Sequence, residues 1–174
     1  NIAYSYDEKS CRIAMYRPFF KQFAYFSSQC NEYVNQWPKI FPTPQTKILV
    51  ICVSGLGGSK EHSVFISNRI IDLNCLDSGT QCFPMFYFEK VKQDQPGLFD
   101  FEKSDYSRRD GISDFILERA RALNPKITKE NIFYYVYGIL HNPDYIKRFS
   151  ADLKKTLPRI PLPEEYWIFK AYCK

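Results

Sequence analysis

Two helical patterns joined by an Asn-Pro pair constrain the last third of the chain more than any other feature. In the first pattern, apolar residues recur at helical spacing after Thr128, which can cap the helix, and the helix should end near His141. Asn142 is then a suitable N-cap, with Pro143 at the first helical position. The second helix has its own apolar face, formed by Tyr145, Ile146, Phe149, Leu153 and Leu157. The sequence therefore predicts two consecutive helices with a tight joint.

Helical spacing also extends to both sides of this pair. Apolar residues between Ile112 and Leu123 recur as on one helix face, and Asn124-Pro125 should end that helix. A last helix is expected from Pro163. We therefore predict a C-terminal bundle of about four helices over residues 105–174.

Residues 1–104 have the patterns of strands instead. Lys47 to Ser54 is a nearly continuous apolar and β-branched run, which is typical of a central strand buried on both faces. Shorter strand candidates are residues 10–15, 22–26, 63–66, 73–76 and 82–91. Pro84 predicts an edge position or a bulge for the last of them. The fold class is α+β, a mixed β-rich N-terminal lobe followed by the helical lobe.

Seven blocks of sequence occur in an order that resembles one protein family. They are Tyr16 to Phe26 (YRPFFKQFAYF), Trp37 to Pro42, Val53 to Lys60 (VSGLGGSK), Ile70 to Leu73, Gln81 to Phe86, Arg108 to Phe115, and Asn131 to Pro161. Together they resemble the C-terminal specificity domain of type ISP restriction-modification enzymes, over nearly the whole chain. Because the chain begins with Asn1 and has no signal-like segment, we expect it to be a piece of a longer polypeptide.

This resemblance implies a DNA target-recognition domain that selects the site for adenine-N6 methylation and restriction. In the full-length proteins of this family, here called parent proteins, a nuclease, an ATP-driven helicase and an S-adenosylmethionine-dependent methyltransferase precede the domain. ATP, magnesium and S-adenosylmethionine are therefore expected only in the parent. The implied partners are double-stranded DNA and the parent's methyltransferase and helicase domains. An alternative is a structural domain that docks onto those domains without reading DNA, and a third hypothesis is a free-standing nuclease.

A glycine-rich segment after the central strand is one candidate DNA-facing loop. Its residues Gly55 to Lys60 match neither the P-loop nor the dinucleotide pattern, so ATP or NAD binding is not expected. Glycine still permits close approach to a phosphate or a base, which makes Ser59 and Lys60 candidate contacts. A glycine turn with a solvated lysine explains the same residues. Glu61 also departs from the proline expected of the family.

Other candidate DNA contacts lie at predicted strand or loop ends: Arg69, Gln81, Lys90 and Lys92. Gln can pair with adenine and Arg or Lys with guanine, but solvated side chains explain these residues equally well. Arg108, at a predicted helix start, is a candidate phosphate contact. Arg109 and Arg17 are expected to have structural roles.

Charge and cysteine spacing exclude several other functions. Residues 103–174 carry 14 Lys+Arg against 9 Asp+Glu, so the net charge of +5 (14 − 9 = 5) lies there, compatible with phosphate contacts or with solubility alone. Six cysteines without a C-x-x-C pair predict free thiols in a reducing cytoplasm, and no zinc site. No apolar run reaches the ~20 residues of a membrane span. No nuclease or methyltransferase motif was found, so we expect no catalytic residues.

Overall fold

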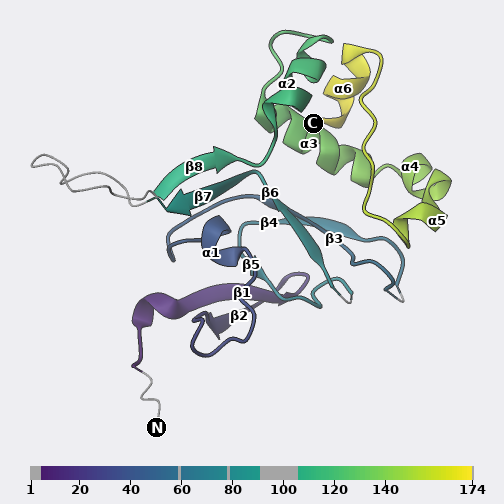
Figure 1. Ribbon diagram of the computed structural model, residues 1–174. Helices are drawn as coiled ribbons and strands as arrows, with labels where there is room; N and C mark the ends of the chain where they lie inside the picture. Colours follow the sequence, from purple (N-terminus) through teal and green to yellow (C-terminus); the bar gives the residue numbers. More distant parts are fainter. Residues whose placement is uncertain (1–4, 59, 78, 91–105, 174) are drawn as a thin grey trace, which may run out of the picture.

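The computed structural model of the protein describes residues 5–58, 60–77, 79–90 and 106–173. Figure 1 shows helices above a central sheet and a second sheet below it, which confirms the predicted α+β class. Its helices are η1 (Glu8–Ser10), α1 (Trp37–Ile40), α2 (Asp114–Arg121), α3 (Lys129–Leu140), α4 (Pro143–Arg148), α5 (Ser150–Leu153) and α6 (Tyr166–Tyr172). Its strands are β1 (Cys11–Arg17), β2 (Phe20–Tyr25), β3 (Val50–Val53), β4 (Val64–Ser67), β5 (Ile70–Ile71), β6 (Gln81–Pro84), β7 (Phe86–Lys90) and β8 (Tyr106–Asp110).

The predicted central strand is β3, which lies between β4 and β6 in an antiparallel sheet. All four of its residues are buried, as the apolar run predicted. Successive side chains of a strand point to opposite faces. Accordingly, Ile51 and Val53 pack in the core shared with the helices, whereas Val50 and Cys52 pack in a second core. One strand therefore joins the two hydrophobic cores.

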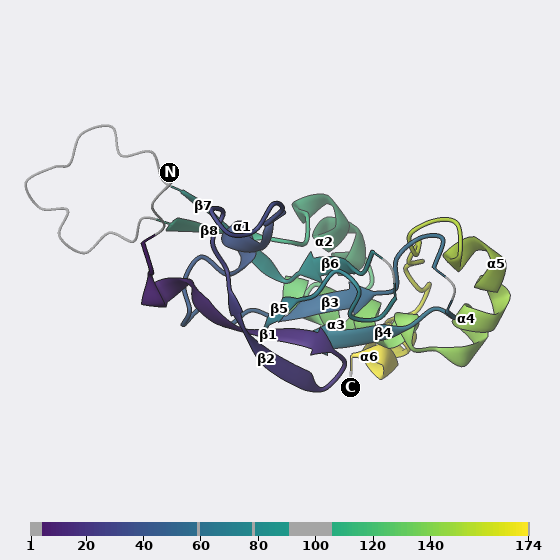
Figure 2. The ribbon, with the colours of Figure 1, turned by 90° about the horizontal axis from the view of Figure 1, so that it is seen from below.

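The second core lies between the central sheet and the sheet of order β2-β1-β5, whose crossing over β3 and β4 is visible in Figure 2. Strands β1 and β2 form an antiparallel hairpin, and β1 pairs in parallel with the short strand β5. The strand predicted at residues 73–76 was wrong, because those residues form turns and the strand is Ile70–Ile71 instead. A parallel pairing of two residues leaves no periodic signal in the sequence.

The predicted strand 82–91 is two strands that belong to different sheets. Strand β6 ends at Pro84 on the edge of the central sheet, which confirms the edge position expected of this proline. After Met85, β7 pairs with β8 in a separate two-stranded sheet. The Met85 N–H donates to the Leu49 carbonyl and its own carbonyl accepts from Gly111. The chain therefore changes sheets at a buried, hydrogen-bonded methionine.

The two consecutive helices begin where the sequence predicted. Thr128 and Asn131 form a reciprocal capping box at the start of α3, and α3 ends with His141 as its C-cap. The Asn142 side chain accepts from the N–H groups of Asp144 and Tyr145 at the start of α4. The second helix is interrupted at Phe149 and continues as α5. The predicted boundary between residues 104 and 105 lies outside the described residues, so the division into two lobes stays a prediction.

Gly138 allows α6 to pack closely on α3. A Cβ atom added at Gly138 would lie 2.5 Å from the backbone carbonyl oxygen of Tyr172, which cannot move without shifting α6. Glycine to alanine inside a helix usually stabilises by roughly 1 kcal/mol. Here we expect the opposite sign, a loss of about 1–3 kcal/mol in the free energy of unfolding from overpacking.

Chemical denaturation of Gly138→Ala measures this effect. The control is Glu118→Ala, an exposed position in α2, which should change stability by less than about 0.5 kcal/mol. A Gly138→Ala variant more stable than the wild type would contradict the close contact between α3 and α6.

Candidate nucleic-acid interface

The structure places the predicted DNA contacts in three separate regions. Lys60 and Gln81 lie at one end of the central sheet, and Arg69 lies at its other end, as the strand register requires. Lys90 and Arg108 lie on the β7-β8 hairpin. Ser59 and Lys92 lie outside the described residues. The described candidates therefore form three groups, one at each end of the central sheet and one on the β7-β8 hairpin.

The glycine loop between β3 and β4 is held by an acidic side chain. The Lys60 N–H donates to Asp77 Oδ2 over 2.9 Å, and a Cβ atom on Gly58 would collide with the same carboxylate. Gly57 has a φ of 72°, which favours glycine, and its N–H donates to the Lys154 carbonyl. Because a carboxylate accepts the Lys60 N–H, the loop backbone is poorly suited to cradle a phosphate. The exposed Lys60 side chain is the part of this loop that can reach DNA.

Gln81 lies next to this loop because it starts β6, directly opposite Val53 at the end of β3. Its side chain is exposed, and its Nε2 donates to the Gly79 carbonyl over 3.0 Å. That bond orients the amide. An ammonium and an oriented amide therefore lie at the same end of the sheet, and both side-chain types can hydrogen-bond to base edges.

Arg108 was predicted at a helix start, and this prediction was wrong. It lies in β8 opposite Phe88, and the helix begins only at Asp114, capped by the Ser113 hydroxyl. The Arg108 guanidinium is 4.4 Å from the centroid of the Phe86 ring, while the residue stays exposed. A cation held on an aromatic face loses little rotamer entropy when it binds an anion.

Ion pairs fix the hairpin and its junction with the helices. Arg109 Nε lies 2.9 Å from Glu89 Oε2 on the neighbouring strand, which is the structural role expected of this arginine. Lys129 Nζ lies 2.6 Å from Asp110 Oδ2 and 2.6 Å from Asp114 Oδ1. These contacts raise the pKa of Lys129 and lower the pKa of Asp114. Asp110 and Asp114 thus serve a structural ion cluster.

Arg69 is half-buried at the turn between β4 and β5. Its backbone N–H donates to Ser67 Oγ over 3.1 Å. Arg12 is also half-buried, and it lines the same small surface depression as Arg69. Sequence patterns gave no signal for this proximity, because it depends on the parallel pairing of β1 with β5. Arg17, expected to be structural, donates to the Asn74 carbonyl and lies over the Tyr16 ring.

His62 is partly buried, and its Nε2 atom has no hydrogen-bond partner among the described residues. Burial, and secondarily the charge of His141, lower the pKa of His62 below its ordinary value of about 6.5. The unfolded chain then takes up the proton first as the pH falls. The stability that depends on neutral His62 is present above about pH 6.5 and is lost below it.

We expect His62→Gln to weaken this acid sensitivity. Melting temperatures of the wild type and the variant at about pH 7.5 and about pH 5.5 measure it, and the drop between the two pH values should be smaller in the variant. His141→Gln should reduce the drop less, because the charge of His141 is the smaller of the two causes that lower the pKa of His62. Equal drops in the wild type and in His62→Gln would contradict the assignment.

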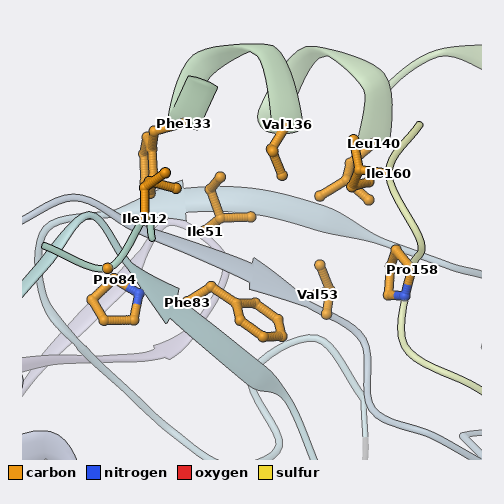
Figure 3. A pocket seen from close by; sticks show the side chains of 11 residues that line it. Ile51, Val53, Phe83, Pro84, Ile112, Phe133, Val136, Leu140, Pro158 and Ile160 are labelled. Atoms are coloured by element: carbon orange, nitrogen blue, oxygen red, sulfur yellow. The ribbon is translucent and has the colours of Figure 1, made fainter. Parts of the chain in front are cut away.

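An apolar pocket of about 230 Å³ lies between β3, β6 and α3. Figure 3 shows Phe133, Val136 and Leu140 of α3 facing Ile51 and Val53 of the sheet. All eleven lining residues are apolar or glycine, so the pocket offers no side chain to a phosphate or a metal ion. No group of three or more potential ligands for a metal ion occurs in the described part of the chain. Among the described helices, none is long and apolar enough to cross a membrane.

Comparison with known protein families gives a match over the whole chain. Residues 1–174 match the Type ISP C-terminal specificity domain. Curated proteins gave no significant match.

Three solved structures similar to this chain contain DNA or a DNA substrate mimic. The ATP-dependent Type ISP restriction-modification enzyme LlaBIII bound to DNA is 27% identical with a TM-score of 0.80, over 98% of this chain. The DrdV-DNA complex is 30% identical with a TM-score of 0.82, also over 98%. A nuclease-deletion mutant of the Type ISP enzyme LlaGI with a DNA substrate mimic is 29% identical with a TM-score of 0.74, over 97%. This chain spans only 11%, 15% and 13% of those three chains, respectively.

Proposed function

The chain belongs to the Type ISP C-terminal specificity domain family, and from this membership we propose that it recognises the DNA sequence on which a larger restriction-modification protein acts. The observation that carries the proposal is the similarity of 97–98% of the chain to parts of three proteins solved with DNA or a DNA substrate mimic. The loops and strand ends described above supply the polar side chains for this function.

We propose that bases are read from the end of the central sheet that carries Lys60 and Gln81. Lysine can donate to guanine O6 and N7, and glutamine can pair with adenine N6 and N7 in the major groove. We assign Lys90 and Arg108 on the hairpin to the sugar-phosphate backbone, a contact that would position the domain without specifying sequence. Asp77 holds the backbone of the loop that carries Lys60. The Lys60 ammonium would therefore approach DNA from a fixed position of the loop.

The parent protein supplies the chemistry in this proposal. A nuclease, an ATP-dependent translocase and an S-adenosylmethionine-dependent adenine methyltransferase would precede this domain and act in the cytoplasm on the DNA that it selects. ATP, magnesium and S-adenosylmethionine would bind those other parts. The chain itself would cleave nothing, and incubation with duplex DNA and magnesium or manganese tests this. Metal-dependent cut products would identify the chain as a nuclease instead.

One observation favours docking onto the methyltransferase or helicase as a second function. The β1-β2 hairpin exposes four large apolar side chains: Ile13, Phe19, Phe20 and Phe23. Phe19 is 92% exposed with a φ of 65°, and Ile13 pairs directly with Phe23. Exposed apolar side chains that lie opposite each other on neighbouring strands, as Ile13 and Phe23 do, are typical of protein contact sites. Phe23→Ser should weaken association with the rest of the parent and leave DNA sequence preference unchanged.

Electrophoretic mobility shift with a pool of duplexes tests the main proposal. We expect the chain to retard the pool at low salt and to lose affinity steeply as salt increases, because phosphate contacts release counterions. Absence of any shift at low salt would contradict DNA binding by this chain and favour the docking function.

A further inference from the structure

Two arginines with unsatisfied hydrogen-bond donors share one depression on the surface. Arg12 Nε and Nη1 and Arg69 Nε are buried from solvent and have no hydrogen-bond partner among the described residues. Buried donors without partners are rare in folded proteins, since each one costs roughly 1–3 kcal/mol. Two arginines in this condition at one place indicate a missing acceptor.

The fold brings these arginines together. Strands β1 and β5 run parallel with Ala14 opposite Ile70, so Arg12 and Arg69 lie at the same end of the strand pair. Both line a depression whose polar rim also includes Thr43, Thr46 and Asn68. The Thr43 and Thr46 hydroxyl oxygens lie 2.9 Å apart. Guanidinium, hydroxyl and amide groups therefore surround one point on the surface.

The charges around this depression are positive and favour the binding of an anion. Burial lowers the pKa of Arg12, and the Asp7 carboxylate opposes this less strongly. Asp7 is engaged elsewhere, because its carboxylate accepts from the Lys9 N–H and the Ser10 hydroxyl at the start of η1. In the described part of the chain, neither Arg12 nor Arg69 therefore has an acid within salt-bridge distance.

The size of the depression limits what can enter it. Its volume is about 20 Å³, which is close to the space needed for one water-sized group. A nucleotide or a small cofactor would not fit. One oxygen atom that protrudes from a larger molecule would fit, with further donors on the rim for a second oxygen.

We propose that Arg12 and Arg69 jointly bind one phosphodiester group of the DNA backbone. This inference rests on the proposed DNA-recognition function and adds a phosphate site that includes Arg12. The two threonine hydroxyls of the rim share one proton between them, which leaves one rim hydroxyl free to donate. Two guanidiniums and this hydroxyl can donate to both free oxygens of a phosphodiester, and charge-assisted bonds of this kind are short and strong. This contact would hold the sugar-phosphate backbone at a second point, at the sheet end opposite the base-reading residues Lys60 and Gln81.

Salt-dependent DNA affinity of the 174-residue chain tests the shared site. Arg12→Gln and Arg69→Gln should each weaken binding about tenfold on any duplex sequence. The double variant should lose little more than either single variant, because both side chains serve one phosphate. Its slope of log affinity against log salt should fall by about one, not two. Arg119→Gln removes an exposed arginine on α2 and should leave the slope unchanged.

Stability without DNA separates binding from a structural role. Because each substitution removes an unsatisfied buried donor, both variants should melt at or above the wild-type temperature. Lower melting temperatures together with unchanged DNA affinity would overturn the site.

Arginine Nε–H signals in NMR spectra test the anion directly. Inorganic phosphate should shift the signals of Arg12 and Arg69, and an equal concentration of acetate should not. If phosphate shifts them while the chain binds no duplex, the proposed function fails and DNA is not the source of the phosphate. An equal response to acetate would identify a protein carboxylate as the occupant, and no response to either anion would overturn the site itself.

Discussion

Replacement of Phe169 by alanine should lower the free energy of unfolding by about 3–5 kcal/mol, as expected for a large aromatic side chain removed from a core. Phe169 is 1% exposed, and its ring stacks on Tyr135 with 4.7 Å between the ring centroids. It is the buried residue of α6. Since a domain of this size is typically stable by about 5–15 kcal/mol, a large part of the total would be lost. Urea denaturation followed by circular dichroism measures the change.

Trp167, two residues before Phe169, provides the control for this prediction. Trp167 belongs to the same helix and is 66% exposed, so Trp167→Ala should cost less than about 1 kcal/mol. Equal losses for the two variants would show that α6 packs on α3 through a different face from the one described.

The double substitution Lys60→Ala with Gln81→Ala should remove most of the sequence preference of the chain. A well-formed contact to a base is worth about 1–3 kcal/mol of discrimination, so the ratio of affinities for preferred and random duplexes should fall at least about tenfold. Affinity for random duplexes should change much less, because backbone contacts supply it. Competition binding with the two kinds of duplex measures both quantities.

A variant with the same residue types removed elsewhere tests whether this effect is local. Gln29 and Lys126 are exposed and lie outside the proposed base-reading region. Their combined replacement by alanine should preserve the affinity ratio. If both double variants lose preference equally, base reading does not lie at the sheet end that carries Lys60.

Local signals in the sequence predicted the helical part well. The Thr128 cap, the Asn142 cap and Pro143 fix helix ends through interactions within four residues, and each was found where expected. The central strand was predictable because a strand buried on both faces is apolar at every position. Membership of the family followed from the order of the sequence blocks, and the α+β class followed from the strand patterns before residue 105 and the helical spacing after it.

Features that depend on distant pairing were missed. Arg108 was assigned to a helix because the following residues have helical spacing, whereas it pairs with Phe88 twenty residues earlier. The short strand β5 exists because it pairs with β1, more than fifty residues away. For the same reason, the proximity of Arg12 to Arg69 could not be predicted from the sequence. Strand pairing is decided by tertiary contacts, and no local period encodes it.

Selection of bound duplexes from a randomised pool, followed by sequencing, tests the central claim most directly. If the chain is the sequence-recognition domain, the bound fraction will contain one enriched motif, and the Lys60→Ala, Gln81→Ala variant will lose that enrichment while it still binds DNA. A wild-type chain that binds the pool without enriching any motif would contradict sequence recognition.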